Sequence, residues 1–182
     1  DCFTVRAMFP KGHKHQGLVA DFVMARKDLG FISGTRKPIL QLGTLSDDLM
    51  RRDFTVNAMA MDMDGNLIDQ WRGQSALMQM TLRTPLDPMT TLMDDPLRLL
   101  RALRFSITRG FRISDPLWDA MMQPGILVKM KDVVSQDRMR DEVTKMMAHD
   151  TVKSLKLLSS IPGLLDVVFS DGLWLMPTSK KV

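Results

Sequence analysis

The sequence predicts an α+β protein in which part of a mixed β-sheet is followed by an all-helical region. Short segments rich in β-branched and aromatic residues alternate with turn residues in the first part of the chain. From about residue 74 onward, apolar residues recur at helical spacing instead. The pattern changes near residues 84–92, so we expect one domain at residues 1–85 and a helical domain at residues 86–182.

Composition narrows the class of protein. The 182 residues are 45% hydrophobic and 25% charged, which is ordinary for a globular protein, and no apolar run approaches the roughly 18 residues of a membrane span. We therefore expect no membrane partner. The single cysteine, Cys2, excludes an intramolecular disulfide and favours a cytoplasmic location. The net charge of +4 is compatible with a polyanionic partner. Nothing in the sequence indicates the oligomeric state.

Two hairpins are predicted in the first domain. Residues 3–9 and 18–24 have strand composition, and the segment PKGHKHQG between them consists of turn residues. The second hairpin turns at Asp64 and Gly65, and its first strand is FTVNAMAM, residues 54–61. One face of that strand would carry Phe54, Val56, Ala58 and Ala60.

A loop and a short helix are predicted between the hairpins. Residues 30–38, GFISGTRKP, form the loop, and residues 45–52, LSDDLMRR, form the helix with Ser46 as its N-cap. Glycine and proline residues separate the later helices. These are predicted in QSALMQM, DDPLRLLRALRFSITRG, DPLWDAMMQ, SQDRMRDEVTKMMAHD and TVKSLKLLSS.

The segment DDPLRLLRALRF, residues 94–105, carries the most specific charge pattern. On a helix its leucines lie on one side, whereas Asp95, Arg98 and Arg101 lie on the other and Arg104 lies near the boundary. One interpretation of this pattern is charge pairing on a solvated helix face. Alternatively, a carboxylate accepts from an exocyclic amino group while a guanidinium donates to ring nitrogen or carbonyl oxygen, so the pair can read cytosine or adenine.

Four segments, in order, resemble one family. LSDDLMRRDFTVNAMA resembles the RRDFTINA motif of class II tRNA nucleotidyltransferases, the CCA-adding enzymes and bacterial poly(A) polymerases. DDPLRLLRALRF resembles the EDxxRxxRxxRF motif of the same family. LIDQWRGQSALMQMTLRTP is similar to the element that links these motifs, and VSQDRMRDEVTKMM is similar to the ERIxxEL helix that supports the neck. The matches cover most of residues 19–147.

The resemblance implies a partial nucleotidyltransferase-type head at residues 1–85 and a helical neck at residues 86–182. It implies that Asp95 and Arg98 pair with the base of incoming CTP or ATP. Arg52 and Asp53 would lie at its ribose and phosphate side. The complete implied nucleotide-binding set is Arg52, Asp53, Asp95, Arg98, Arg101 and Arg104.

The implied activity is addition or repair of the 3′-terminal CCA of tRNA. The tRNA 3′-hydroxyl attacks the α-phosphate of CTP or ATP, pyrophosphate leaves, and Mg²⁺ assists the transfer. The implied partners are therefore the tRNA 3′ end, CTP and ATP. A poly(A) polymerase of the same family is an alternative. A non-catalytic nucleotide- or RNA-binding remnant, or one subunit of a split enzyme, is another.

The catalytic metal ligands are the main departure from the family pattern. The family supplies them as Asp-x-Asp after a Gly-Gly-x-x-Arg-Asp loop, which this sequence lacks, so we expect the chain to be a fragment that starts after the catalytic strand. Asp21 matches an acidic position on a later strand and is a candidate auxiliary catalytic carboxylate. Asp62 and Asp64 have the Asp-x-Asp spacing but fall in the predicted hairpin turn. His13 and His15 have no further ligand nearby in sequence and indicate a solvated loop.

Overall fold

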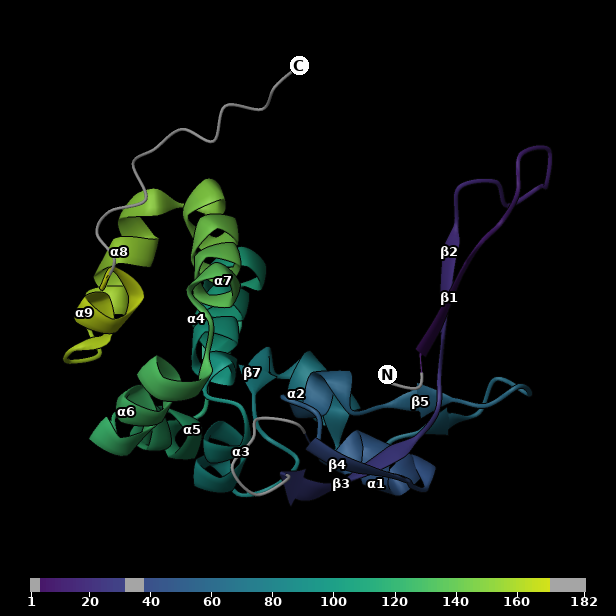
Figure 1. Ribbon diagram of the computed structural model, residues 1–182, viewed down its shortest axis with the longest axis horizontal. Coiled ribbons are helices and arrows are strands. Elements are labelled where there is room, and N and C mark those ends of the chain that lie inside the picture. Colours follow the sequence, from purple (N-terminus) through teal and green to yellow (C-terminus); the bar gives the residue numbers. More distant parts are fainter. Residues whose placement is uncertain (1–3, 32–37, 171–182) are drawn as a thin grey trace. The chain divides into compact units, whose positions relative to one another are not determined.

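The computed structural model describes residues 4–31 and 38–170 and divides the chain into two compact units, Asp1–Met50 and Arg51–Val182 (Figure 1). The predicted domain boundary at residues 85 and 86 falls within the second unit and stays a prediction. Together, small sheets followed by a mainly helical region confirm the predicted α+β class. Among the described residues, none of the helices has the length and apolar character that a membrane span requires.

The first unit consists of two antiparallel strand pairs and one helix. β1 (Thr4–Met8) pairs with β2 (Val19–Val23), which confirms the predicted first hairpin. β3 (Arg26–Phe31) pairs with β4 (Pro38–Leu42), so the ends of the predicted GFISGTRKP loop are strand residues, and its centre lies outside the described residues.

Helix α1 (Leu45–Met50) confirms the predicted short helix but not its N-cap. Ser46 lies inside the helix, and Thr44 caps it. The Thr44 hydroxyl accepts from the Asp47 N–H at 3.2 Å, while the Asp47 carboxylate accepts from the Thr44 N–H at 2.8 Å. This reciprocal capping box satisfies two backbone donors, whereas a Ser46 cap would have satisfied one.

The second unit begins with short elements that surround Gly73. They are the 3₁₀ turn η1 (Thr55–Asn57), the hairpin of β5 (Ala60–Met61) and β6 (Leu67–Ile68), helix α2 (Gly73–Met78), and β7 (Thr81–Leu82), which pairs in parallel with β8 (Arg112–Ile113). A Cβ on Gly73 would lie 2.3 Å from the Thr55 carbonyl oxygen, so glycine alone permits α2 to start against η1.

The predicted strand at residues 54–61 is wrong over most of its length. Only Ala60 and Met61 belong to a strand, because the chain first turns at η1. The Asp53 carboxylate accepts from the Phe54 N–H at 2.8 Å and from the Asn57 side-chain amide at 3.0 Å, and these bonds hold the turn. Phe54 and Ala58 are buried as expected, but a turn rather than a pleated strand places them inside. The predicted turn at Asp64 and Gly65 is confirmed.

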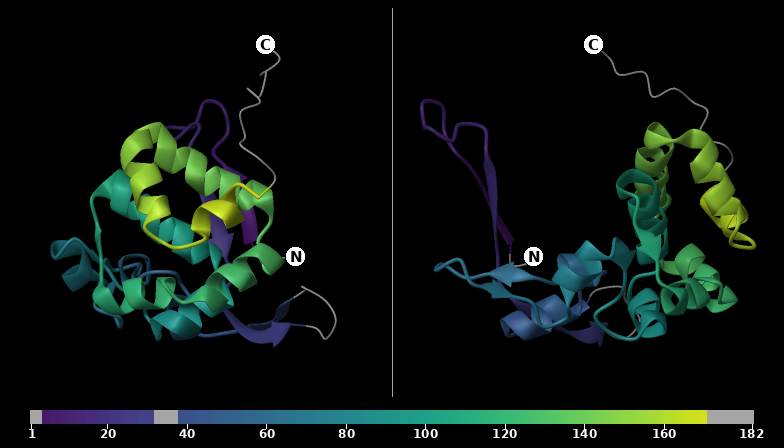
Figure 2. Two further views of the ribbon diagram at one scale, coloured as in Figure 1. Left: turned by 90° about the vertical axis from the view of Figure 1, so that its left-hand side faces the viewer. Right: turned by 180° about the vertical axis from the view of Figure 1, so that it is seen from behind.

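The helices of the helical region are α3 (Pro88–Asp94), α4 (Leu97–Arg109), α5 (Asp115–Met121), α6 (Pro124–Val133), α7 (Gln136–His149), α8 (Thr151–Ser159) and α9 (Leu164–Val168). They confirm the predicted segments at α4, α5, α7 and α8, whereas α3, α6 and α9 were not predicted. Helix α4 is central and packs along α7 (Figures 1 and 2). Leu99, Leu100 and Leu103 of α4 are fully buried, as their spacing predicts, and Met139, Val143 and Met146 of α7 complete this part of the core.

One helix boundary differs from the prediction in a way that matters for function. A continuous helix was expected from Asp94, but α3 ends there and α4 starts at Leu97. Asp95 between them is extended, with φ −141° and ψ 98°, because the ring of Pro96 disfavours helical geometry at the preceding residue. Asp95 therefore lies in the turn between α3 and α4 and does not belong to the charged face of α4.

Candidate functional site

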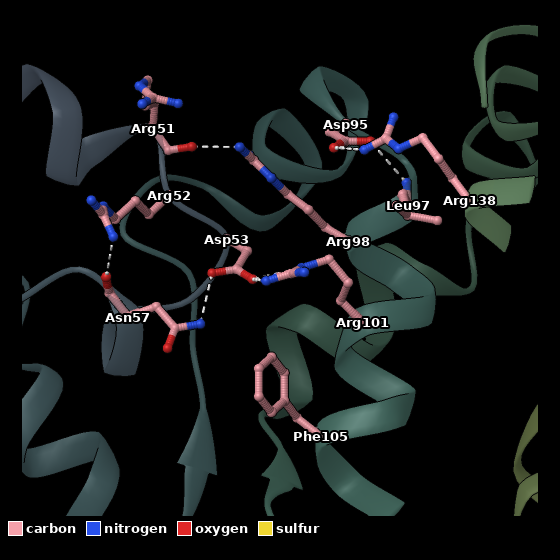
Figure 3. Close-up of a pocket in the computed structure, with 10 residues that line it drawn as sticks. All are labelled: Arg51, Arg52, Asp53, Asn57, Asp95, Leu97, Arg98, Arg101, Phe105 and Arg138. Atoms are coloured by element: carbon pink, nitrogen blue, oxygen red, sulfur yellow. Dashed lines mark hydrogen bonds and ion pairs between the residues drawn. The ribbon is translucent and has the colours of Figure 1, made fainter. Parts of the chain in front are cut away.

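The second unit contains an open pocket of about 600 Å³ where η1, the α3–α4 turn, α4 and α7 meet (Figure 3). Arginines outnumber aspartates in its lining, so the pocket is suited to an anionic ligand. The lining residues are Arg51, Arg52, Asp53, Asn57, Asp95, Leu97, Arg98, Arg101, Phe105 and Arg138. Five of the six predicted nucleotide-binding residues therefore line one pocket. Helices α2 and α3 separate residues 52 and 53 from residues 95–101 in the chain.

Asp53 is the buried carboxylate of the pocket, with 8% of the residue exposed. One of its oxygens accepts from Phe54 and Asn57, and the other accepts from Nε and Nη2 of Arg101 at 2.8 and 2.5 Å (Figure 3). Both oxygens are thus occupied by protein donors. Asp53 therefore orients Arg101.

Arg101 lies between two carboxylates. Its Nη1 is 3.5 Å from Glu142 of α7, in addition to its bonds to Asp53. Burial lowers the pKa of the Arg101 guanidinium, but the charges of Asp53 and Glu142 and the hydrogen bond to Asp53 outweigh this and raise the pKa above its ordinary value. Arg101 is therefore a fixed, permanently charged group in the pocket wall.

Arg98 is held by backbone carbonyls. It donates through Nη1 to the Thr91 carbonyl oxygen at 3.0 Å and through Nη2 to the Arg51 carbonyl oxygen. Burial is the largest influence on Arg98 and lowers the pKa of its guanidinium, with partial compensation by the charge of Asp95. Because a guanidinium has five N–H groups, the two carbonyl bonds orient the side chain and leave donors for a ligand.

Asp95 lies at the α3–α4 turn, three residues before Arg98. One carboxylate oxygen accepts from the Leu97 N–H at 3.2 Å, and the other accepts from Arg138 of α7 at 3.0 Å (Figure 3). Each carboxylate oxygen can accept a second bond. Asp95 and Arg98 thus present an acceptor and a donor to the same pocket.

Of the two remaining predicted residues, Arg52 lines the pocket and Arg104 does not. Arg52 is exposed and donates to the Asn57 carbonyl oxygen at 3.3 Å. Arg104 pairs with Glu142 at 2.5 Å and lies over the ring of Phe105, 4.5 Å from its centre. Its predicted nucleotide contact stays a prediction.

Asp21 belongs to the first unit and pairs with Arg6 across the β1–β2 hairpin. The two bonds are 2.7 and 2.9 Å long, and the hydrogen bonding to Arg6 lowers the pKa of the Asp21 carboxyl. The pair explains the charge without a catalytic role, and a role of Asp21 in catalysis stays a prediction. His13 and His15 are exposed neighbours in the loop of the same hairpin, as expected.

The described residues do not fit a divalent-metal site. Residues 4–31 and 38–170 contain no group of three His, Cys, Asp or Glu side chains that could hold a metal ion. Asp62, whose spacing to Asp64 suggested a metal pair, instead accepts from the N–H groups of Asp64 and Asn66 at 2.9 and 2.8 Å. It stabilises the β5–β6 turn.

Sequence reasoning missed two residues of α7. Arg138 belongs to the helix that was expected only to support the neck, but it lines the pocket and bonds to Asp95. Glu142 is buried, with 4% of the residue exposed, and pairs with Arg101 and Arg104. The available signal was their i,i+4 spacing, which places both side chains on one face of α7.

Comparisons with known proteins define the class. Residues 30–83 match the family model of the Poly A polymerase head domain, which indicates a nucleotidyltransferase family. The "CCA-adding enzyme" of Geobacillus thermodenitrificans (strain NG80-2) is 32% identical over 191 residues, covering 94% of this chain and 45% of the relative. The chain belongs to the family of class II CCA-adding enzymes and poly(A) polymerases, which confirms the resemblance.

Solved structures support the fold. The crystal structure of the Bacillus stearothermophilus CCA-adding enzyme in complex with CTP has a TM-score of 0.72 at 28% identity, covering 85% of this chain and 36% of that one. A tRNA nucleotidyltransferase complexed with a primer tRNA and an incoming ATP analog has a TM-score of 0.69 at 25% identity, covering 94% of this chain and 48% of that one. The chain thus spans less than half of the length of each of these proteins.

Proposed function

We propose that the protein is a CTP/ATP-dependent tRNA nucleotidyltransferase that adds or repairs the 3′-terminal CCA of tRNA, and that this chain supplies the pocket that selects the nucleotide. The observation that carries the proposal is the presence of Asp95 and Arg98 in one pocket with Arg52, Asp53 and Arg101. Arg52 and Asp53 come from a segment far from Asp95 and Arg98 in the chain, and the fold brings both segments to one pocket. Support also comes from relatives whose structures hold CTP or an ATP analog and tRNA.

Base selection follows from the polarity of the two groups. Cytosine and adenine both carry an amino group beside an unprotonated ring nitrogen. The Asp95 carboxylate would accept from the amino group, and the Arg98 guanidinium would donate to the ring nitrogen. Guanine and uracil place a carbonyl oxygen where the amino group should be, so Asp95 would oppose an acceptor with an acceptor. Such a mismatch costs the energy of an unpaired buried polar group.

The arginines would hold the anionic part of the nucleotide. Arg52 is exposed at the pocket, and Arg101 is fixed by Asp53 and Glu142. Guanidinium groups match phosphate oxygens in charge and geometry. Arg104 would reinforce Glu142 in this network and contact the nucleotide only secondarily.

In the proposed reaction the tRNA 3′-hydroxyl attacks the α-phosphate of CTP or ATP, and pyrophosphate leaves. Mg²⁺ is the cofactor that we propose for this transfer, as in other nucleotidyltransferases. The described residues supply no carboxylate cluster for it. In this proposal their role is nucleotide binding and base selection. An auxiliary role of Asp21 and a cytoplasmic location remain parts of the proposal.

A poly(A) polymerase of the same family is the second candidate, because the matching family model carries that description. Such an enzyme would use Asp95 and Arg98 for adenine alone. Binding of CTP therefore distinguishes the CCA-adding enzyme from the poly(A) polymerase.

Isothermal titration of each of the four nucleoside triphosphates, as the Mg²⁺ complex, into this chain tests the proposal. We expect CTP and ATP to bind at the same site and to compete, and GTP and UTP to bind at least tenfold more weakly, which corresponds to about 1.4 kcal/mol. Binding of ATP alone would favour the poly(A) polymerase. Equal binding of all four, or of none, would contradict base selection by this pocket. Binding without transfer to tRNA would favour a remnant or a split-enzyme subunit.

A further inference from the structure

The contact between Arg138 and Asp95 connects helix α7 to the α3–α4 turn. Arg138 lies on α7, and its Nη2 donates to a carboxylate oxygen of Asp95 at 3.0 Å. The other Asp95 oxygen has only the longer bond from the Leu97 N–H, at 3.2 Å. Arg138 is thus the stronger of two restraints on the carboxylate.

Asp95 needs such a restraint because of its backbone. It stands in an extended turn between α3 and α4 and precedes Pro96. Its side chain is one third exposed, at 33%, so packing alone does not fix its rotamer. A base-reading carboxylate must keep its orientation before the base arrives, since a mobile one loses rotamer entropy on binding.

We propose that Arg138 is a positioning residue for nucleotide selection: it holds the Asp95 carboxylate in the orientation that accepts the amino group of cytosine or adenine. The inference rests on the proposed function, because it deepens the role of Asp95. It assigns a specificity function to α7, which otherwise contributes to the core and to the network around Glu142.

A direct phosphate contact is the competing explanation, since Arg138 also lines the pocket. The two explanations differ in what they predict for UTP. If Arg138 acts through Asp95, its loss weakens the binding of CTP, which offers an amino group, and leaves the binding of UTP unchanged. If Arg138 holds phosphate, its loss weakens the binding of CTP and UTP equally.

The test is isothermal titration of CTP and UTP into the whole chain and into Arg138→Ala. We expect CTP binding to weaken about fivefold, which is the upper range for a partly exposed ion pair, and UTP binding to stay within twofold. Arg138→Lys, which keeps a cationic donor, should recover part of the CTP affinity. The matched control is Arg140→Ala, which removes an arginine from the same helix but none from the pocket lining, and should leave both affinities unchanged.

A double-mutant cycle decides the mechanism. In an Asp95→Ala background, adding Arg138→Ala should have no further effect on CTP binding, because the group that Arg138 positions is gone. An equal further loss in that background would overturn the inference, as would a parallel loss of CTP and UTP or tighter CTP binding by Arg138→Ala. Thermal denaturation of each variant shows whether it is folded. If the unmodified chain bound no triphosphate, the proposed function and this inference would both fail, whereas unchanged CTP binding by Arg138→Ala would remove this inference alone.

Discussion

Arg101 and Asp53, 48 positions apart in the chain, share two hydrogen bonds of 2.8 and 2.5 Å. Both bonds end on the same carboxylate oxygen, while the other oxygen holds the η1 turn through Phe54 and Asn57. One carboxylate therefore joins the turn after Arg52 to the central helix α4. The Asp53–Arg101 pair therefore has a structural role in addition to its place in the pocket.

Asp53→Ala should destabilise the second unit. It would remove the partner of Arg101 and two bonds of the η1 turn. A fully buried pair broken in this way costs about 3–5 kcal/mol, and we expect about 2–3 kcal/mol because the Arg101 side chain is 32% exposed. Urea denaturation measures the change. The control is Arg112→Ala, which breaks the exposed pair with Asp115 and should have little effect. Equal midpoints for the two variants would contradict a structural role of Asp53.

Arg98→Ala should weaken the binding of CTP and ATP together, because one guanidinium is proposed to serve both bases. Loss of such a base contact costs about 1–3 kcal/mol. Titration calorimetry with each nucleotide gives the two values. Arg109→Ala, an exposed position near the end of the same helix, is the control and should bind both nucleotides normally. If a folded Arg98→Ala variant kept its affinity, Arg98 would not be the base-reading arginine.

Gly73→Ala should destabilise the second unit, because the added methyl group would lie 2.3 Å from the Thr55 carbonyl oxygen and 2.6 Å from Cγ of Met59. Forcing this overlap typically costs about 1–3 kcal/mol. The matched control is Gly125→Ala in α6, where no atom lies within 4 Å of the added methyl group. That variant should be neutral or slightly more stable, by up to about 1 kcal/mol. Differential scanning calorimetry compares them, and equal effects would argue against a close approach at Gly73.

The β5–β6 turn should depend on the ionisation of Asp62. Hydrogen bonds from the side chain and backbone of Asn66 lower the pKa of the Asp62 carboxyl below its ordinary value. A group whose folded pKa is lowered stabilises the fold above its unfolded pKa, which is about 3.9 for aspartate. That stabilisation is lost as the pH falls through the lower folded value.

Asn66→Ala should raise the Asp62 pKa toward the ordinary value, as followed by an NMR titration of the carboxyl carbon. Met63→Ala alters the same turn at a fully exposed side chain and should leave the pKa unchanged. A titration of Asp62 that is identical in Asn66→Ala and the unmodified chain would show that the Asn66 side chain does not lower its pKa.

Much of the architecture was predictable because local patterns determine it. The first hairpin, helix α1 and most of the later helices follow from strand composition, turn residues and helical spacing that lie within a few positions of each other. The buried leucines of α4 were predictable for the same reason. The sequence also indicated the family, and with it five of the ten residues that line the pocket, because its motifs keep their order and spacing.

Other features depended on contacts that no short segment contains. The 3₁₀ turn replaced a predicted strand because the Asp53 carboxylate holds it, and Arg101 holds that carboxylate from a distant helix. Alternation of apolar residues could not reveal this bond.

Sequence patterns indicated several charged residues of the pocket, whereas the packing of the helices set the partner of each side chain. Asp95 leaves the α4 stripe because of Pro96, a local cause, but its carboxylate meets Arg138 only because α7 packs along α4. Glu142 likewise becomes a buried partner of Arg101 and Arg104 through the same packing. Helical periodicity specifies the face of a side chain, and only the packing of helices specifies what that face meets.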